Sequence, residues 1–111
     1  MYGKVLIGKI EVGMAANAAS PIIYRNIFHE DFIRKAQEKD PDIEIYQKMG
    51  YVMAMQAETS DMNELMKLSL NSYVDWLTQF EPMDVLTAVD QISELYFGNT
   101  IGTTDPKNKG D

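Results

Sequence analysis

Residues 41–58 read PDIEIYQKMGYVMAMQAE, and this stretch of the sequence decides the fold. Asp40 can cap a helix here, Pro41 suits the first helical position, and acidic side chains follow in the first turn. The apolar residues fall on two faces, one with Ile43, Tyr46, Met53, Ala54 and Ala57 and the other with Ile45, Met49 and Val52. A helix with apolar side chains on most sides is usually buried, so we expect this one to be the central helix of a bundle.

The N-terminal residues, about 4–13, are expected to form a β-hairpin. Ile10 and Val12 alternate with Lys9 and Glu11, which is the periodicity of a strand, and Gly8 can supply the positive φ of a tight turn. Two strands alone are only marginally stable, so the hairpin must pack on helices or pair with another chain. We favour a lid on the core over an edge that is open to strand addition.

Turn and cap signals divide the rest of the chain into further helices. We expect Ser20 to cap a helix with Pro21 at its first position, and His29 to interrupt the pattern before a helix over about 30–39. Further helices are expected over about 62–69, over 72–80 behind a capping box from Ser72 to Asp75, and from Pro82 to a stop at Gly98.

The expected fold is therefore mainly α: a compact helical bundle of about five to six helices with a small N-terminal β-hairpin. At 111 residues, the chain is predicted to hold a single helical domain over residues 1–99. A flexible polar C-terminal tail is predicted over 100–111, because only Ile101 is apolar among Gly, Thr, Pro, Lys, Asn and Asp.

The chain is acidic, with a formal net charge of −7 that is unevenly distributed. Residues 1–35 carry five basic and three acidic side chains, whereas residues 36–100 carry three basic and twelve acidic ones. An acidic body repels phosphate, so nucleic-acid binding is disfavoured, and basic partner segments would be attracted. No segment reaches the run of about 18 apolar residues of a membrane span, and residues 1–12 do not form a signal peptide.

The sequence contains no residue pattern that is typical of catalysis. The chain has no cysteine and only one histidine, His29, whose acidic neighbours follow directly in sequence and do not converge on one point of a helix. Carboxylate pairs such as Asp90 and Glu94 are expected to solvate an exposed face. The sequence thus predicts no catalytic residue, no metal site and no cofactor, and the chain is not expected to be an enzyme.

Methionines and aromatic residues are the candidates for partner binding. Five of the eight methionines, at positions 49, 53, 55, 62 and 66, cluster in the middle of the chain. Methionine fills gaps in cores and also coats adaptable binding surfaces, and exposure of two or three of these residues would favour the second role. We predict that Tyr24, Met62, Met66 and Trp76 bind a partner, although each of them could equally belong to the core.

Four segments, in this order, resemble tail assembly chaperones of long-tailed (siphovirus-type) phages and prophages. They are AANAASPIIYRNIF at 15–28, YVMAMQA at 51–57, VDWLTQFE at 74–81 and ELYFGN at 94–99. The resemblance covers nearly the whole chain, and it resides in the ordered set because no single motif is diagnostic. The sequence departs from the family at His29, where members often have glycine, and over 61–70, which looks longer than usual.

The resemblance implies a chaperone that binds the tape measure protein and keeps it soluble during tail morphogenesis. It also implies location in the host cytoplasm, absence from the mature virion, and a longer frameshifted form that contacts the tail tube protein. Two alternatives remain open: a structural head–tail or tail-completion protein that stays in the virion, and an acidic regulator that mimics DNA. Self-association into a homo-oligomer also remains open.

Overall fold

The computed structural model describes residues 2–98, which form two antiparallel strands followed by six helices. The elements are β1 (Tyr2–Ile7), β2 (Ile10–Ala15), α1 (Ser20–Phe28), α2 (Phe32–Ala36), α3 (Glu44–Glu58), α4 (Met62–Leu65), α5 (Leu70–Leu77) and α6 (Asp84–Tyr96). The mainly α class with a small N-terminal hairpin is thereby confirmed. The tail predicted over 100–111 lies outside the described residues.

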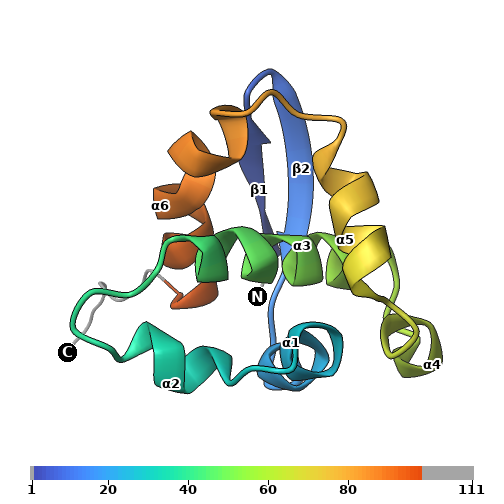
Figure 1. Cartoon of the computed structure of the whole chain (residues 1–111). Helices are drawn as coiled ribbons and strands as arrows, with labels where there is room; N and C mark the ends of the chain where they lie inside the picture. The colour runs from blue at the N-terminus through green and yellow to red at the C-terminus, as the bar shows by residue number, and fades with distance from the viewer. Residues whose placement is uncertain (1, 99–111) are drawn as a thin grey trace, which may run out of the picture.

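Helix α3 runs through the centre of the molecule, as predicted. The hairpin, α5 and α6 lie on one side of it, and α1 and α2 lie on the other (Figure 1). All six residues from Met49 to Ala54 are buried, which requires neighbours around the whole circumference of the helix. The predicted start at Pro41 is wrong, because the helix begins at Glu44, whose backbone N–H donates to Asp42 Oδ1 at 2.9 Å.

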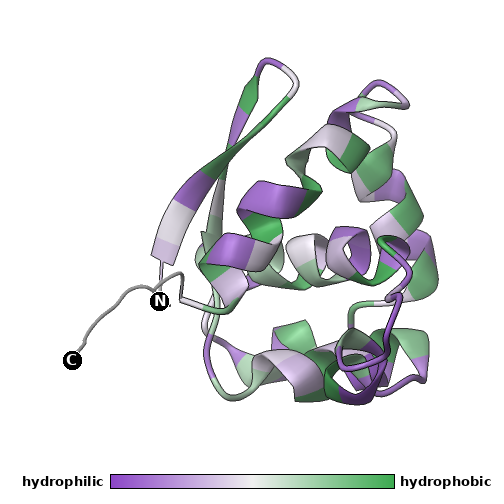
Figure 2. Cartoon of the chain, turned by 90° about the vertical axis from the view of Figure 1, so that its left-hand side faces the viewer, coloured by the Kyte–Doolittle hydropathy of each residue, from purple (hydrophilic) through white to green (hydrophobic). Residues whose placement is uncertain are grey.

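The hairpin covers one end of the core. Ile7 pairs with Ile10 across the two-residue loop Gly8-Lys9, and Gly8 has a φ of +63° at the first loop position, where a type II′ turn requires glycine. Hydrophobic and more polar residues alternate along β2, whereas β1 ends in three hydrophobic residues, Val5, Leu6 and Ile7 (Figure 2). The side chains of Val5, Ile7 and Met14 are buried, so the hairpin serves as the expected lid.

Two helices, α1 and α5, do not begin as predicted. In each case the serine that was expected to cap the helix forms other hydrogen bonds. Ser20 does not cap α1 from outside: it lies inside the helix, fully buried, and its Oγ accepts from the N–H of Asn17 and donates to Gln56 Oε1 of α3 at 2.5 Å. The predicted capping box from Ser72 to Asp75 is also wrong. The box joins Ser69 and Ser72, so α5 begins at Leu70.

The break after α1 is made by His29, which adopts the left-handed conformation with a φ of 57° and is exposed. Its N–H donates to the carbonyl of Arg25, and the chain then turns into α2, whose first turn is capped by Asp31. Helix α2 spans only Phe32–Ala36 and not the predicted 30–39. A side chain with a Cβ is strained in this conformation, which glycine adopts freely.

Replacement of His29 tests this strain. His29→Val should lower the free energy of unfolding by about 1–2 kcal/mol, because a β-branched residue fits the left-handed region poorly. His29→Gly should change it by less than about 0.5 kcal/mol, because relief of strain offsets the added freedom of the unfolded chain. Urea unfolding of the three proteins measures both values, and equal stability of the Val and Gly variants would contradict the strained turn.

Helices α3 and α6 approach closely at Gly50. A Cβ added there would lie 2.8 Å from Cδ1 of Ile92, which is fully buried on α6. Such a contact is closer than packed carbon atoms allow, so Ile92 would have to move. The absence of a side chain at Gly50 therefore sets how closely the two helices pack.

A double-mutant cycle tests this contact. Ile92→Val removes Cδ1 and should make room for the new methyl group of Gly50→Ala. The double variant should therefore lose less stability than the sum of the two single variants, by at least about 0.5 kcal/mol in urea unfolding. Gly50→Ala combined with Ile7→Val, at the hairpin tip, is the control and should be additive. Additivity in both pairs would mean that Ile92 does not limit the approach.

Candidate functional site

The four predicted partner-binding residues divide into exposed and buried positions. Met62 is 42% exposed and Met66 is 40% exposed, whereas Tyr24 is 0% exposed and Trp76 is partly buried against the core. Of the other three clustered methionines, Met49 and Met53 are buried and Met55 is partly buried. Two exposed methionines meet the condition under which the sequence favours a binding surface over core filling.

Two apolar side chains of α5, the next helix along the chain, are also exposed. Leu70 is 56% exposed and Val74 is 49% exposed, and a spacing of four residues places them on the same side of their helix. Met62 and Met66 have the same spacing. We call these four residues, Met62, Met66, Leu70 and Val74, the α4–α5 apolar surface. Exposed side chains of this size on neighbouring elements are typical of protein–protein contact sites.

The segment that carries this surface is held in place by a few contacts. Leu65 of α4 is buried, and Asp61 caps the helix by accepting from the N–H of Asn63 at 2.9 Å. From α1, Asn26 Nδ2 donates to the carbonyl oxygen of Met66 at 2.9 Å. These contacts anchor the backbone while the side chains of Met62 and Met66 remain exposed.

Leu70, one of these four residues, lines a hollow of about 440 Å³ between α1 and the start of α5. Its lining includes Phe28, Leu68 and Leu70, with Lys48 and Asn26 as polar groups. Sequence reasoning missed Leu70 and Val74. Their i, i+4 spacing was visible, but the predicted start of α5 at Ser72 left Leu70 outside the helix.

Tyr24 contributes to the core and has no surface that a partner can reach. Its ring packs against Phe28 and Phe32, with centroids 5.0 and 5.2 Å apart, and its hydroxyl donates to Glu30 Oε2 at 2.5 Å. Lys48 Nζ lies 3.1 Å from the same oxygen. Burial and the neighbouring Glu30 raise the pKa of Tyr24, so its hydroxyl stays protonated and continues to donate.

Glu30 accepts hydrogen bonds from Tyr24 and Lys48, and these bonds stabilise its ionised form. Burial alone would raise its pKa, but the hydrogen bonds from Tyr24 and Lys48 and the charges of Lys48 and Lys35 lower the pKa below its ordinary value of 4.5. The ionised form therefore favours the folded state. This contribution is present above about pH 4.5 and is lost as the pH falls through the folded-state pKa.

Replacement of Glu30 tests this cluster. Glu30→Gln should lower the free energy of unfolding at pH 7 by about 1–2 kcal/mol, because the charge-assisted hydrogen bonds are weakened. The difference from the original protein should shrink as the pH falls from about 4.5 through the folded-state pKa, below which Glu30 is protonated in both states. Chemical denaturation from pH 3 to 7 measures it, with exposed Glu94→Gln as the control. A difference that does not vary with pH would contradict the ionised cluster.

Trp76 lies on a second hollow, away from the α4–α5 apolar surface. Its indole packs on Tyr51 and Phe80 with centroids 5.5 and 5.0 Å apart. The remaining part of the ring faces a hollow of about 380 Å³ that is bounded by β2, the C-terminal half of α3 and α5. The structure therefore does not bring Trp76 together with Met62 and Met66 in one hollow.

Within residues 2–98, no three His, Asp or Glu side chains lie close enough together to hold a metal ion, and His29 is exposed. In the same range, no helix is long and apolar enough to cross a membrane. Exposed apolar side chains on α4 and α5 are a feature of this part of the chain that suits contact with a partner.

Comparison of the chain with protein-family models, curated proteins and solved structures finds no match. The four segments at 15–28, 51–57, 74–81 and 94–99 fall largely on regular elements. Residues 20–28 form α1, residues 51–57 lie in α3, residues 74–77 end α5 and residues 94–96 end α6. Each of these helices packs into the same core.

Proposed function

We propose that this protein is a tail assembly chaperone of a long-tailed (siphovirus-type) phage or prophage. It binds the tape measure protein and keeps it soluble during tail morphogenesis. The observation that carries the proposal is the ordered set of four family-like segments along nearly the whole chain. Support comes from a mainly helical fold with exposed apolar side chains on α4 and α5.

The α4–α5 apolar surface suits a long helical partner. An amphipathic helix presents apolar side chains at spacings of three and four residues, which match a short apolar face made by neighbouring helices. Methionine side chains are flexible and polarisable, so Met62 and Met66 can adapt to different apolar side chains along one partner. A chaperone of a long and repetitive chain needs such adaptable contacts.

The acidic body supports the same function. Asp61, Glu64 and Asp75 are exposed on the segment that carries the apolar surface. They would attract basic side chains that flank an apolar stripe on the partner. The net charge of −7 would also keep a complex with a poorly soluble chain in solution.

Several further properties belong to this proposal. The protein acts by binding and not by catalysis, works in the host cytoplasm and is absent from the mature virion. A longer frameshifted form contacts the tail tube protein. A head–tail or tail-completion protein would instead remain in the particle, so the location of the chain separates the two functions.

Co-expression with the tape measure protein encoded nearby tests the proposal. Affinity pull-down and a solubility assay should show a soluble complex of the two proteins, and purified virions should lack the chain. Failure to form the complex, with the chain present in virions, would establish the structural function in place of the chaperone.

Charged substitutions test the surface. Met66→Glu combined with Leu70→Glu should weaken binding of the tape measure protein by about tenfold or more, because it places charge in a desolvated contact. Ile33→Glu on α2 is the matched control, since Ile33 is 39% exposed and lies on another element. Circular dichroism checks that both variants fold, and equal loss of binding in both would rule out this surface.

A further inference from the structure

The two edges of the hairpin differ in whether another element forms hydrogen bonds with them. The backbone N–H of Leu6 in β1 donates to Gln91 Oε1 of α6 at 3.3 Å and thus points away from β2. Leu6 lies opposite Glu11 in the ladder. Because the N–H of Leu6 points outward, Leu6 and Glu11 form a pair without hydrogen bonds between them. By the alternation of an antiparallel ladder, the backbone groups of Glu11 and Gly13 point outward along the opposite edge.

These outward groups have no partner in the described chain. The edge of β1 lies against α6, where Gly3 also contacts Leu95. Within residues 2–98, no backbone or side-chain group forms a hydrogen bond with the N–H or C=O of Glu11 or Gly13 beyond the ladder itself. The edge of β2 is therefore a short row of free donors and acceptors, which can template another strand.

A hollow lies beside this free edge, lined by Glu11, Gly13 and other residues of the hairpin. It has a volume of about 380 Å³ and is lined by residues of the hairpin, of the C-terminal half of α3 and of α5. In Figure 1, β2 and α5 lie on the same side of α3. Small residues of α3, Ala54 and Ala57, leave space in the floor, and Trp76 forms part of the wall. The indole N–H of Trp76 donates to no group in the described range.

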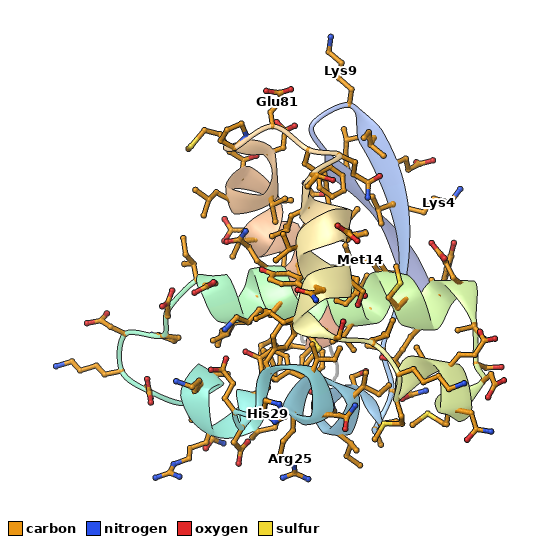
Figure 3. The ribbon with its side chains drawn as sticks, turned by 45° about the vertical axis from the view of Figure 1, so that its right-hand side comes forward. Lys4, Lys9, Met14, Arg25, His29 and Glu81 are labelled. Atoms are coloured by element: carbon orange, nitrogen blue, oxygen red, sulfur yellow. The ribbon has the colours of Figure 1, made fainter. Side chains whose placement is uncertain are left out.

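The side chains of an added strand would point alternately to the two faces of the hairpin. Ile10 and Val12 line the hollow, whereas Lys4 projects from the outer face, away from the helices (Figure 3). Because side chains alternate along a strand, every second one would enter the hollow and the others would join Glu11 on the outer face. The strand should therefore alternate between apolar and polar residues.

The charges beside the hollow indicate which polar residues an added strand should carry. Glu11 and Glu58 both border the hollow. Glu58 forms no ion pair in the described part of the chain, and the pair of Glu11 with Lys4, at 3.6 Å, is more than half exposed and so weak. A basic strand is favoured, whereas a second copy of this hairpin would bring another Glu11 to the same short edge.

We propose that the free edge of β2 binds an extended segment of a partner protein in which apolar residues alternate with lysine or arginine. The segment adds a third strand to the hairpin through the backbone groups of Glu11 and Gly13. Its apolar side chains contact Ala57 and Trp76, and its basic side chains lie near Glu11. This site goes beyond the chaperone function, because it takes an extended chain and is separate from the α4–α5 apolar surface.

A synthetic peptide tests the site on the full-length protein. The probe has about seven residues, with valine at alternate positions and lysine between them, which spans the length of β2. Its addition should shift the NMR signals of the Glu11 and Gly13 amides and of the Trp76 indole. It should also slow hydrogen exchange at both amides by at least about tenfold, because they become hydrogen-bonded. The same peptide with glutamate in place of lysine should not bind.

Three variants locate the binding. Glu11→Pro removes an outward N–H that the ladder does not use and should weaken binding by about tenfold or more. Lys4→Pro makes the same change on the covered edge of β1 and should bind normally. Ala57→Arg fills the floor of the hollow without altering the hairpin and should also abolish binding. This variant provides an independent test if Glu11→Pro does not fold.

Three outcomes would overturn the proposal. The first is the absence of any shift with the lysine peptide. The second is a response confined to Met62, Met66 and Leu70, which would assign the peptide to the other surface. The third is slow exchange of the Glu11 and Gly13 amides in the dilute protein without peptide, which would mean that the edge is already covered.

Discussion

The burial of α3 on all sides is the constraint on which the rest of the structure depends. A helix that exposes apolar side chains around its circumference must be enclosed, and the hairpin, α1, α2, α5 and α6 together provide that enclosure. Aromatic rings at centroid distances of 5.0 to 5.5 Å link these helices through the core. The linked rings are those of Tyr24, Phe28, Phe32, Tyr51, Tyr73 and Tyr96.

Enclosing α3 leaves the surface with two different kinds of binding feature. Helix α4 and the start of α5 use only part of their apolar residues for the core, so Met66 and Leu70 remain exposed. The hairpin rests its β1 edge on α6 and leaves its β2 edge free. Side-chain contacts would dominate at the first feature and backbone hydrogen bonds at the second, so the two suit a helical and an extended partner respectively.

Sequence reasoning succeeded where the cause is local or strongly periodic. The turn at Gly8 follows from the need for a positive φ, and the central position of residues 41–58 follows from apolar residues on two faces. It failed at boundaries where several side chains compete for the same role. Ser69 and Ser72 both resemble caps, and Ser20 carries a good capping side chain that instead bonds to Gln56 on a distant helix.

The sequence by itself determined the mainly α class, the N-terminal hairpin and the acidic character. Only the tertiary structure decided which apolar residues are reachable. Tyr24 and Met66 were equal candidates in sequence, yet one is enclosed by Phe28 and Phe32 and the other is exposed. The physical reason is that a periodic pattern marks which side of a helix is apolar, whereas exposure depends on which neighbours pack against that side.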